Sequence, residues 1–523
     1  MGKELVIIHY HLRPGGVRRV IELGVAKLLS KLNCDSVTLA AGEYPPDNWL
    51  EIFKSKINGR NLRLFIRPSF CYLSEQNCSG DDLHEIISKD VGELFRCLKG
   101  EDAVLWFHNP AVGRNVILTD RIFRKSAETG IPLVAHHHDW WFENRWQRLD
   151  EMFQCGFDSL EKIAAVFFNT SPNIKHCAIN YFDYSILNKY FKNNSAWLPN
   201  PIESGYSASR SDIESAKNWL NEVLNDSSPV WIMPCRVLRR KNIAEALLIK
   251  EWINPSSWLV TTAGASSSGE TSYAEAVQTF AKEKQIKFRL GIIPNNHHNA
   301  PDVYSLIAAS EVVLLTSLQE GFGLTYIEAA IMKVPLIARM LPNLEGDFEK
   351  FGLRFPYKYR DILIHPDLFS WKDEAERQRK IFESWLEKLP CQFREWVKLP
   401  EIARDSGPPS PTPFSKLTLQ GQLEVLAHEP SYSFEKCVAL NPFIAKLKKK
   451  LHTGRLKAVE LSQSTLELLS LENYAENFIR LLKTVHQPLT DESISVQIQN
   501  EFIRKKLASE FIYPQLIEQP VEQ

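Results

Sequence analysis

The chain has 523 residues, of which 44% are hydrophobic and 24% are charged. This length exceeds what one core organises, so two to four domains are expected, and the composition is that of a globular protein. Lysine and arginine (62) nearly balance aspartate and glutamate (63). A chain with almost no net charge has no overall electrostatic field that would attract a polyanion. Nucleic acid is therefore excluded as an expected partner.

The amino terminus and the cysteines indicate a cytoplasmic protein. The opening sequence MGKELVIIHYH has an apolar run of five or six residues, which His9 and His11 interrupt. That run is too short for a signal peptide, and no segment approaches the roughly 18 apolar residues of a membrane span. The nine cysteines are scattered without a CxxC pair, as expected for reduced thiols. Peripheral membrane contact stays open, and nothing indicates the oligomeric state.

Two regions of the chain repeat a short apolar run, a polar loop and an amphipathic helix. Apolar runs without alternation are typical of parallel strands covered on both faces. Two such series predict an α/β protein with two doubly wound, Rossmann-like domains that face each other across a cleft. The predicted strands are 4–10, 35–41, 62–66, 103–108, 132–138 and 164–169 in the first region, and 229–235, 257–263, 286–292, 311–316 and 334–338 in the second.

The domain boundaries follow from where this alternation starts and stops. Residues 1–200 form the predicted amino-terminal domain, and the segment 197–209, rich in Pro, Ser and Gly, is the expected crossover. The predicted second domain covers 201–486 and contains an irregular insert at 343–440. Residues 487–523 are expected to form a closing helix and tail that pack on the first domain.

A glycine pair follows the first predicted strand. Gly15 and Gly16 precede a helix over 17–29, so the backbone can approach a ligand closely and the helix start offers free N–H groups to negative charge. A tight strand-to-helix turn without a ligand is the alternative interpretation.

A basic segment, CRVLRRKN, follows the first strand of the second region. Arg236 and Lys241 are five residues apart across a strand-to-helix turn, at the carboxyl end of the sheet, where doubly wound domains bind ligands. A diphosphate leaving group gains negative charge as a glycosidic bond breaks, and in the absence of a metal fixed cations must stabilise it. A solvated basic turn is the alternative.

The segment SLQEGFGLTYIEAA is the most specific signal in the chain. Glu320 follows a buried strand, Gly321 and Gly323 form a turn that exposes backbone amides, and Glu328 is expected in the first turn of a helix that starts near Leu324. Two carboxylates eight residues apart can accept hydrogen bonds from sugar and ribose hydroxyl groups. Glu328 could alternatively serve only to stabilise its helix dipole.

A run of three histidines ends a strand of the first region. Consecutive residues of a strand face opposite sides, so His136, His137 and His138 cannot all bind one ion, and no metal site is predicted. His138, the last of the run, is the one best placed to reach a ligand. The aromatic residues 140–142 that follow could stack on a sugar ring or belong to the core.

These segments together resemble the retaining nucleotide-sugar transferases of glycosyltransferase family 4, which have the GT-B fold. EGFGLTYIEAA resembles the EX7E motif of that family, and RVLRRKN resembles its Arg-x4-Lys phosphate clamp. The glycine pair, the strand that ends in His-Asp and the segment WLPNPIE are similar to further family features, as is the helix at 470–483. Two departures are the residues RMLPNLEGDF, where the family has a Gly-Gly-x-Pro-Glu turn, and the segment after 343, which has no family counterpart.

The resemblance implies an enzyme that moves a hexose from a nucleotide-diphosphate sugar, a UDP- or GDP-hexose, to an acceptor with retention of configuration and without a metal or other cofactor. Arg236 and Lys241 would bind the pyrophosphate, Glu328 the ribose, and Glu320 with the Phe322–Leu324 backbone, including Gly323, the hexose. Gly15 and Gly16 would close over the phosphates, and His138 would contact the sugar.

The acceptor stays open between a small molecule, a glycan and a lipid-linked compound. The alternative functions are a sugar-nucleotide epimerase, a phosphorylase, and a non-catalytic or regulatory protein that binds sugar nucleotides.

Overall fold

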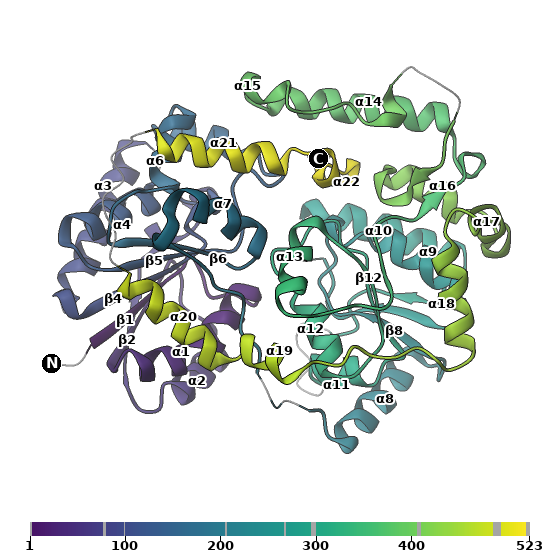
Figure 1. The fold of residues 1–523 in the computed structure, drawn as a ribbon, viewed down its shortest axis with the longest axis horizontal. Helices are drawn as coiled ribbons and strands as arrows, with labels where there is room; N and C mark the ends of the chain where they lie inside the picture. Colours follow the sequence, from purple (N-terminus) through teal and green to yellow (C-terminus); the bar gives the residue numbers. More distant parts are fainter. Residues whose placement is uncertain are drawn as a thin grey trace. The chain divides into compact units, whose positions relative to one another are not determined.

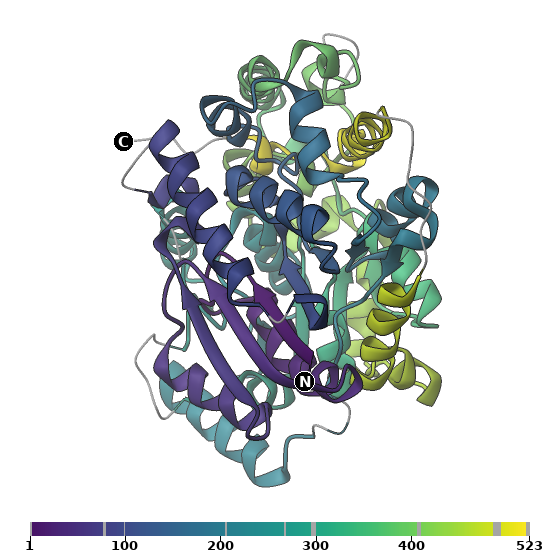
Figure 2. The ribbon, with the colours of Figure 1, turned by 90° about the vertical axis from the view of Figure 1, so that its left-hand side faces the viewer.

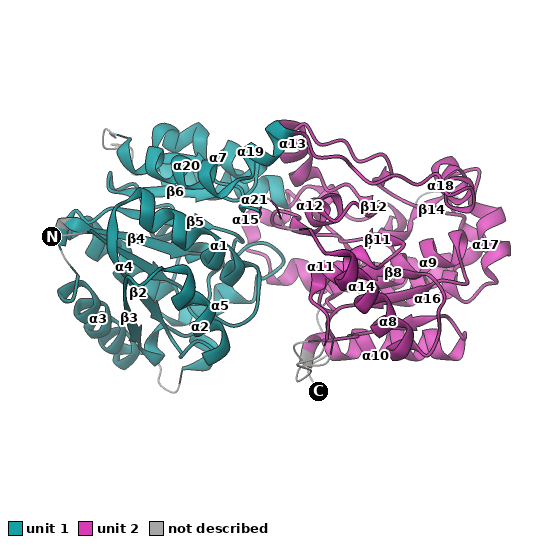
Figure 3. Ribbon diagram, turned by 90° about the horizontal axis from the view of Figure 1, so that it is seen from below, with its two compact units in different colours: residues 1–204, 463–506 teal, residues 205–462, 507–523 magenta. Residues whose placement is uncertain are grey.

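The structure, a computed structural model, describes residues 3–76, 80–98, 100–203, 205, 207–265, 268–293, 300–404, 409–484 and 493–518. The chain forms two compact units (Figures 1 and 3). Unit 1 contains residues 1–204 and 463–506, and unit 2 contains residues 205–462 and 507–523. Both units are built on a parallel sheet with helices on its two faces, which confirms the predicted α/β class with two Rossmann-like domains.

The sheet of unit 1 has seven parallel strands in the order β3-β2-β1-β4-β5-β6-β7. Helices α1, α2 and α20 pack on one face, and α3, α4 and α6 lie on the other (Figure 2). The strands are β1 (Lys3–Ile8), β2 (Cys34–Ala41), β3 (Asn61–Ile66), β4 (Ala103–His108), β5 (Leu133–His137), β6 (Ile174–Ala178) and β7 (Ser195–Trp197). The helices are α1 (Gly16–Lys31), α2 (Asp47–Lys56), α3 (Asp81–Arg96), α4 (Val116–Thr129), α5 (Arg148–Gln154), α6 (Leu160–Phe167), α7 (Tyr181–Phe191), α19 (Gln463–Leu468), α20 (Leu471–Lys483) and α21 (Ile494–Lys506).

The prediction of a strand at 164–169 is wrong, because residues 164–167 form the end of helix α6 and the chain leaves the helix at Phe168. The Ser159 hydroxyl accepts a hydrogen bond from the Lys162 amide (3.2 Å) and caps that helix. The buried side chains of Leu160, Ile163 and Phe167 recur at helical spacing. The strand at this place in the sheet is β6, whose sequence IKHCA lacks a continuous apolar run.

Helix α20 belongs to the core of unit 1, although its residues were predicted with the second domain. Tyr474 and Phe478 are buried against α1 and the sheet. A Cβ atom at Gly24 of α1 would lie 3.1 Å from the Tyr474 ring, so the glycine permits the close packing of the two helices.

The sheet of unit 2 has six parallel strands in the order β10-β9-β8-β11-β12-β13, which repeats the arrangement of unit 1. The strands are β8 (Val230–Met233), β9 (Trp258–Thr261), β10 (Phe288–Arg289), β11 (Val312–Leu315), β12 (Leu336–Arg339) and β13 (Lys358–Tyr359), with a separate antiparallel pair β14 (Leu363–Ile364) and β15 (Thr412–Pro413). The helices are α8 (Arg210–Leu224), α9 (Ile243–Ile253), α10 (Ser268–Glu283), α11 (Val303–Ala308), α12 (Leu324–Ile331), α13 (Pro342–Lys350), α14 (Trp371–Lys388), α15 (Cys391–Arg394), α16 (Leu419–Leu426), α17 (Pro430–Cys437), α18 (Pro442–His452) and α22 (Pro514–Ile517).

Residues 343–440 are largely helical, not irregular as predicted. Helix α14 alone has 18 residues, and its buried side chains are Glu374, Gln378, Phe382 and Trp385. Their spacing of three and four residues is helical, but two of the four are polar, which hides the pattern in the sequence.

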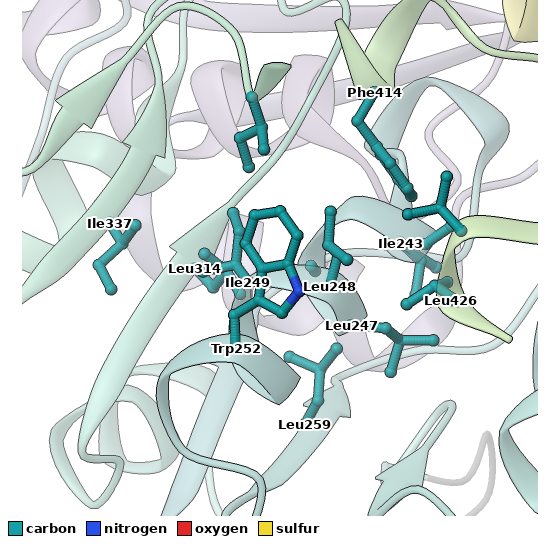
Figure 4. Packing of buried hydrophobic residues seen from close by; sticks show 14 of the residues in the cluster. Ile243, Leu247, Leu248, Ile249, Trp252, Leu259, Leu314, Ile337, Phe414 and Leu426 are labelled. Carbon is teal, nitrogen blue, oxygen red and sulfur yellow. The ribbon is translucent and has the colours of Figure 1, made fainter. Parts of the chain in front are cut away.

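The helices after β13 cover α9, every residue of which is buried. Helices α16, α17 and α18 contact α9, and the Trp252 indole donates a hydrogen bond to the Ser433 hydroxyl (2.9 Å). The apolar cluster around Trp252 joins α9, the sheet and the segment at Phe414 (Figure 4). Every side of α9 is buried, including its charged residues Glu245, Lys250 and Glu251, so these helices complete the core of unit 2.

Among the described residues, the cysteines are free thiols. No helix in the described ranges combines the length and the apolar character needed to cross a bilayer.

Candidate functional site

The predicted site residues of unit 2 lie in the loops that follow β8 and β11. These two strands are neighbours at the point where the strand order reverses, and their carboxyl ends therefore bring both loops together. Arg236 is exposed in the first loop, which ends in the short helix η6 (Arg239–Lys241). Asn242 follows η6 in the left-handed conformation (φ 48°) and turns the chain into α9.

Lys241 and Glu320 form an ion pair between the two loops. The other Glu320 oxygen accepts a hydrogen bond from the Arg240 guanidinium (3.1 Å), and the Ser317 hydroxyl donates to the same oxygen as Lys241 (2.6 Å). The side chains of Lys241 and Glu320 are 12% and 14% exposed, so the pair is sheltered yet reachable. Of the four predicted catalytic residues, His138, Arg236, Lys241 and Glu320, the structure thus brings Lys241 and Glu320 into contact.

Glu320 is ionised because of these neighbours. Burial by itself would raise the pKa of its carboxyl group, but the charges of Lys241 and Arg240 and the hydrogen bonds from Lys241 and Ser317 lower that pKa to about 2. The result is a fixed group of two cations and one carboxylate at the end of the sheet.

The glycine turn after Glu320 is required by the fold. Gly323 has φ 77°, and a Cβ atom there would lie 2.9 Å from both Leu344 Cδ1 and the Tyr326 ring. Helix α12 starts at Leu324, next to the buried Phe322. The Asn343 amide group donates to the Glu320 carbonyl (2.8 Å) and fixes the turn from the side of α13.

Glu328 lies in the second turn of α12, not in the first turn as predicted, because the helix starts at Leu324 and Glu328 is its fifth residue. Its carboxylate accepts a hydrogen bond from the Tyr304 hydroxyl of α11 (3.4 Å). This position removes the argument that Glu328 stabilises the start of its helix, where such an effect is confined to the first turn.

The remaining predicted residues, Gly15, Gly16 and His138, belong to unit 1. Gly15 precedes α1 and Gly16 is its first residue, and both are exposed. A Cβ atom on Gly15 would meet nothing nearer than Arg13 O at 4.0 Å, and one on Gly16 would meet nothing within 4 Å. The backbone at Gly15 is extended (φ 167°), so the fold itself does not require glycine at this position.

His138 is 7% exposed and follows β5. Its backbone N–H donates to the Asn109 side chain (3.3 Å), and its Nε2 lies 3.1 Å from His108 Nδ1. Burial lowers the pKa of His138 to about 4 against the opposing charge of Asp139, so the ring is neutral at neutral pH. Sequence reasoning did not foresee its pairing with the neighbouring strand.

The three consecutive histidines divide between the two faces of the sheet, as predicted. His137 bonds His176 on the neighbouring strand (Nε2 to Nδ1, 3.0 Å). His136 and His138 instead share a side with His108, and the ligand atoms of these three buried rings lie within 4.8 Å of one another. Such a group could hold a metal ion, and the sequence argument missed it because His108 is 28 residues away on β4.

The aromatic residues after His138 are core residues, and the sugar-stacking alternative is wrong. Trp140 and Trp141 are fully buried and Phe142 is 2% exposed. The Trp140 indole donates to the Asp183 carboxylate (2.9 Å), and its ring packs on Phe502 of α21.

The buried histidines of unit 1 predict a loss of stability in acid. Burial lowers the pKa of His9 to about 3 and those of His138 and His176 to about 4. Below pH 6.5 these histidines bind protons in the unfolded chain but not in the folded unit. The free energy of unfolding therefore decreases as the pH is lowered from 6.5 to the pKa values of the folded state. By pH 5 each histidine should cost about 2 kcal/mol. Urea unfolding at pH 7.5, 6 and 5 at constant ionic strength measures this, and equal stability at pH 5 and 7.5 would contradict it.

Sequence reasoning also missed Arg240, to which it gave no role in the site. The sequence signal for Arg240 was its position next to Lys241. The segment Arg239–Lys241 is too short for all three basic side chains to point away from the site. Its guanidinium binds both the Gln319 carbonyl (2.9 Å) and the Glu320 carboxylate.

Comparison with known proteins gives sequence relatives of one kind. No family model matches the chain. The mannosylglucosyl-3-phosphoglycerate synthase of Petrotoga mobilis is 23% identical over 395 residues, which are 74% of this chain and 73% of the relative. The mannosylglucosylglycerate synthase of the same organism is 23% identical over 271 residues, 47% of this chain and 59% of the relative. Among solved structures, Anabaena HepE in complex with UDP-glucose matches 86% of this chain and 100% of its own, at 14% identity and a TM-score of 0.44.

Proposed function

We propose that this chain is a glycosyltransferase that moves a hexose from a nucleotide-diphosphate sugar to a small polar acceptor, with retention of configuration and without a metal. The observation that carries the proposal is the charged group of Lys241, Arg240 and Glu320 at the strand-order reversal of unit 2. The sequence relatives are synthases whose names denote glycosylated products, and they support the assignment to glycosyltransferases as a class.

The proposed chemistry is electrostatic. Breaking the bond between hexose and diphosphate leaves additional negative charge on the phosphate, and the cations of this loop are proposed to stabilise it. Lys241 and the exposed Arg236 would bind the diphosphate. Glu320 holds Lys241 in place before the donor binds, so little reorganisation is needed when the charge develops.

The remaining contacts of the donor follow from the same loops. Glu320 and the backbone from Phe322 to Leu324, including Gly323, are proposed to bind the hexose, and Glu328 the ribose. In unit 1 the loop of Gly15 and Gly16 is proposed to cover the phosphates, since its glycines leave room that the fold does not use. His138, neutral at neutral pH, is proposed to contact the sugar.

Donor binding without an acceptor is the direct test. A panel of UDP-, GDP- and ADP-hexoses is expected to contain one donor that raises the melting temperature, because a ligand at 100 times its dissociation constant stabilises the native state by about 2.7 kcal/mol. We expect a uridine or guanosine compound. The corresponding nucleoside diphosphate should stabilise the protein as well, and a panel without any effect would contradict the proposal.

Product analysis then separates the proposal from its alternatives. Glucosides of glycerate and of phosphoglycerate are the first acceptors to test, given the products that the relatives' names denote. Proton NMR of the new linkage reports retention, and activity in the presence of a chelator reports metal independence. Conversion of the donor without an acceptor would instead indicate an epimerase, and binding without turnover a regulatory protein.

A further inference from the structure

Three arginines of unit 1 gather beside its own strand-order reversal, outside the residues used above. Arg114 follows β4, and Arg145 and Arg148 follow β5. Strands β1, β4 and β5 are neighbours, so their carboxyl ends meet where doubly wound sheets bind ligands. Tyr72 lies against this group, with the Arg114 guanidinium 4.9 Å from the centre of its ring.

Arg148 is buried without a full set of partners. The residue is 4% exposed, and one nitrogen of its guanidinium, Nη1, donates to the Val112 carbonyl. Its Nε is buried and has no hydrogen-bond partner among the described residues. The same holds for Nη1 of Arg145 within those residues. Each of these two nitrogens can donate a hydrogen bond to an acceptor that the described part of the chain does not itself supply.

The charges around Arg148 are mainly positive. Burial and the neighbouring charges of Arg145 and Arg114 push the pKa of Arg148 well below its usual range, and the opposing effects of Tyr72 and Asp139 are smaller. Asp139 forms an ion pair with Arg145 (3.7 Å, beyond hydrogen-bond length) and only partly offsets these positive charges. A buried cation among mainly positive neighbours is costly, so an anion placed here would relieve both the repulsion and the unmade hydrogen bonds.

The surrounding side chains connect this group to the ligand-binding edge of the sheet. The Tyr72 hydroxyl and His11 Nε2 are 2.8 Å apart, and His11 belongs to the segment after β1 that leads to Gly15 and Gly16. The fully buried Tyr10 donates its hydroxyl proton to backbone carbonyls after β4, at 3.3 Å. Arginine groups of this kind suit carboxylate and phosphate, because the planar guanidinium offers paired donors.

We infer that Arg114, Arg145 and Arg148 bind an anionic group of the sugar acceptor, either a carboxylate or a phosphate monoester. The identification of the bound molecule as the sugar acceptor rests on the proposed function. The presence of an anion site does not rest on it. The acceptor is therefore a negatively charged small molecule, and a neutral analogue is a poor substrate.

Anion binding is tested first without turnover. Sodium phosphate and sodium acetate, each compared with sodium chloride at equal ionic strength, represent the two kinds of anion. At least one of them should raise the melting temperature of the wild-type protein. Arg145→Gln and Arg114→Gln should remove that shift, whereas Arg96→Gln, the same change on an exposed part of α3, should retain it. Arg145 and Arg114 are half-buried, which makes these variants more tolerant than a change at Arg148.

Kinetics provide the second readout. Arg145→Gln should raise the KM for an anionic acceptor about 10- to 100-fold, as expected for a lost hydrogen bond between charged groups, with a much smaller effect on a neutral analogue. A shift with phosphate but not acetate assigns a phosphate ester, and the reverse assigns a carboxylate.

Failure of this inference can be told apart from failure of the proposed function. Absence of any anion-specific shift in the wild-type protein, or equal shifts in wild type, Arg145→Gln and Arg114→Gln, would overturn the anion site even if a sugar nucleotide binds. If the protein shows the anion-specific shift but binds no sugar nucleotide, the anion site would be supported and the proposed transferase function would be wrong.

Discussion

Replacing Lys241 with alanine is expected to lower the turnover number at least about 100-fold, because the lysine stabilises charge that develops only as the donor bond breaks. Glu320→Ala should cause a loss of similar size. The carboxylate holds Lys241 in place, and its pKa of about 2 keeps it charged over the whole working range of pH. Steady-state rates with the true donor and acceptor measure both effects.

A matched control separates this effect from a general change of charge. Lys217 is an exposed lysine on α8 of the same unit, and Lys217→Ala should keep turnover within about twofold. The donor-induced shift in melting temperature should decrease in Lys241→Ala, since the diphosphate loses a contact in the ground state as well. Near-normal turnover in both Lys241→Ala and Glu320→Ala would show that the catalytic site does not lie in these loops.

Replacing Glu245 with alanine is expected to destabilise unit 2 by about 3–5 kcal/mol, the usual cost of leaving a buried charge without its partner. Glu245 is fully buried and pairs with Arg339, which is 1% exposed. It also accepts hydrogen bonds from the Tyr359 hydroxyl (2.6 Å) and the Asn242 side chain (3.0 Å). The pair thus ties the loop of the charged group to β12 and β13.

Hydrogen exchange of the amides in β8, β11 and β12 reports the stability of unit 2 separately from that of unit 1. The double variant Glu245→Met, Arg339→Met should be less destabilised than Glu245→Ala, because neither charge is left unpaired. Glu345→Ala breaks a surface ion pair with Arg360 (2.9 Å) and should change stability by less than about 1 kcal/mol. Unchanged exchange in Glu245→Ala would show that the pair contributes nothing.

The sequence was most informative where local patterns and topology agree. The strands at β1, β4, β8 and β11 are continuous apolar runs, and their order places the two loops of unit 2 together. The opposite case is β6, a strand with two buried polar side chains. Lys175 bonds to Asn194, and His176 contacts the Asn169 carbonyl and His137 of the neighbouring strand, so the sequence of the strand appears polar. Helix α14 is similar, since Glu374 is fully buried and satisfied by Thr418. Partners distant in sequence decide both cases.

The candidate site was predictable only in part for the same reason. Lys241 and Glu320 lie in recognisable motifs, and the structure places them in contact. The group of Arg114, Arg145 and Arg148 has no motif, because its members follow two different strands. The buried member, Arg148, packs close to Gly113 beside Trp141, which the sequence does not indicate. A list of polar residues after each predicted strand would have included them without distinguishing them from surface arginines.

The division of the chain has a consequence for how the protein is made. The chain leaves unit 1 at residue 204, returns at 463 and leaves again after 506. During synthesis at about 5–20 residues per second, the ribosome finishes all seven strands of unit 1 long before it reaches α20 and α21. The apolar face that Tyr474 and Phe478 later fill is exposed throughout that interval. A fragment that stops at residue 204 is therefore expected to keep this apolar surface uncovered.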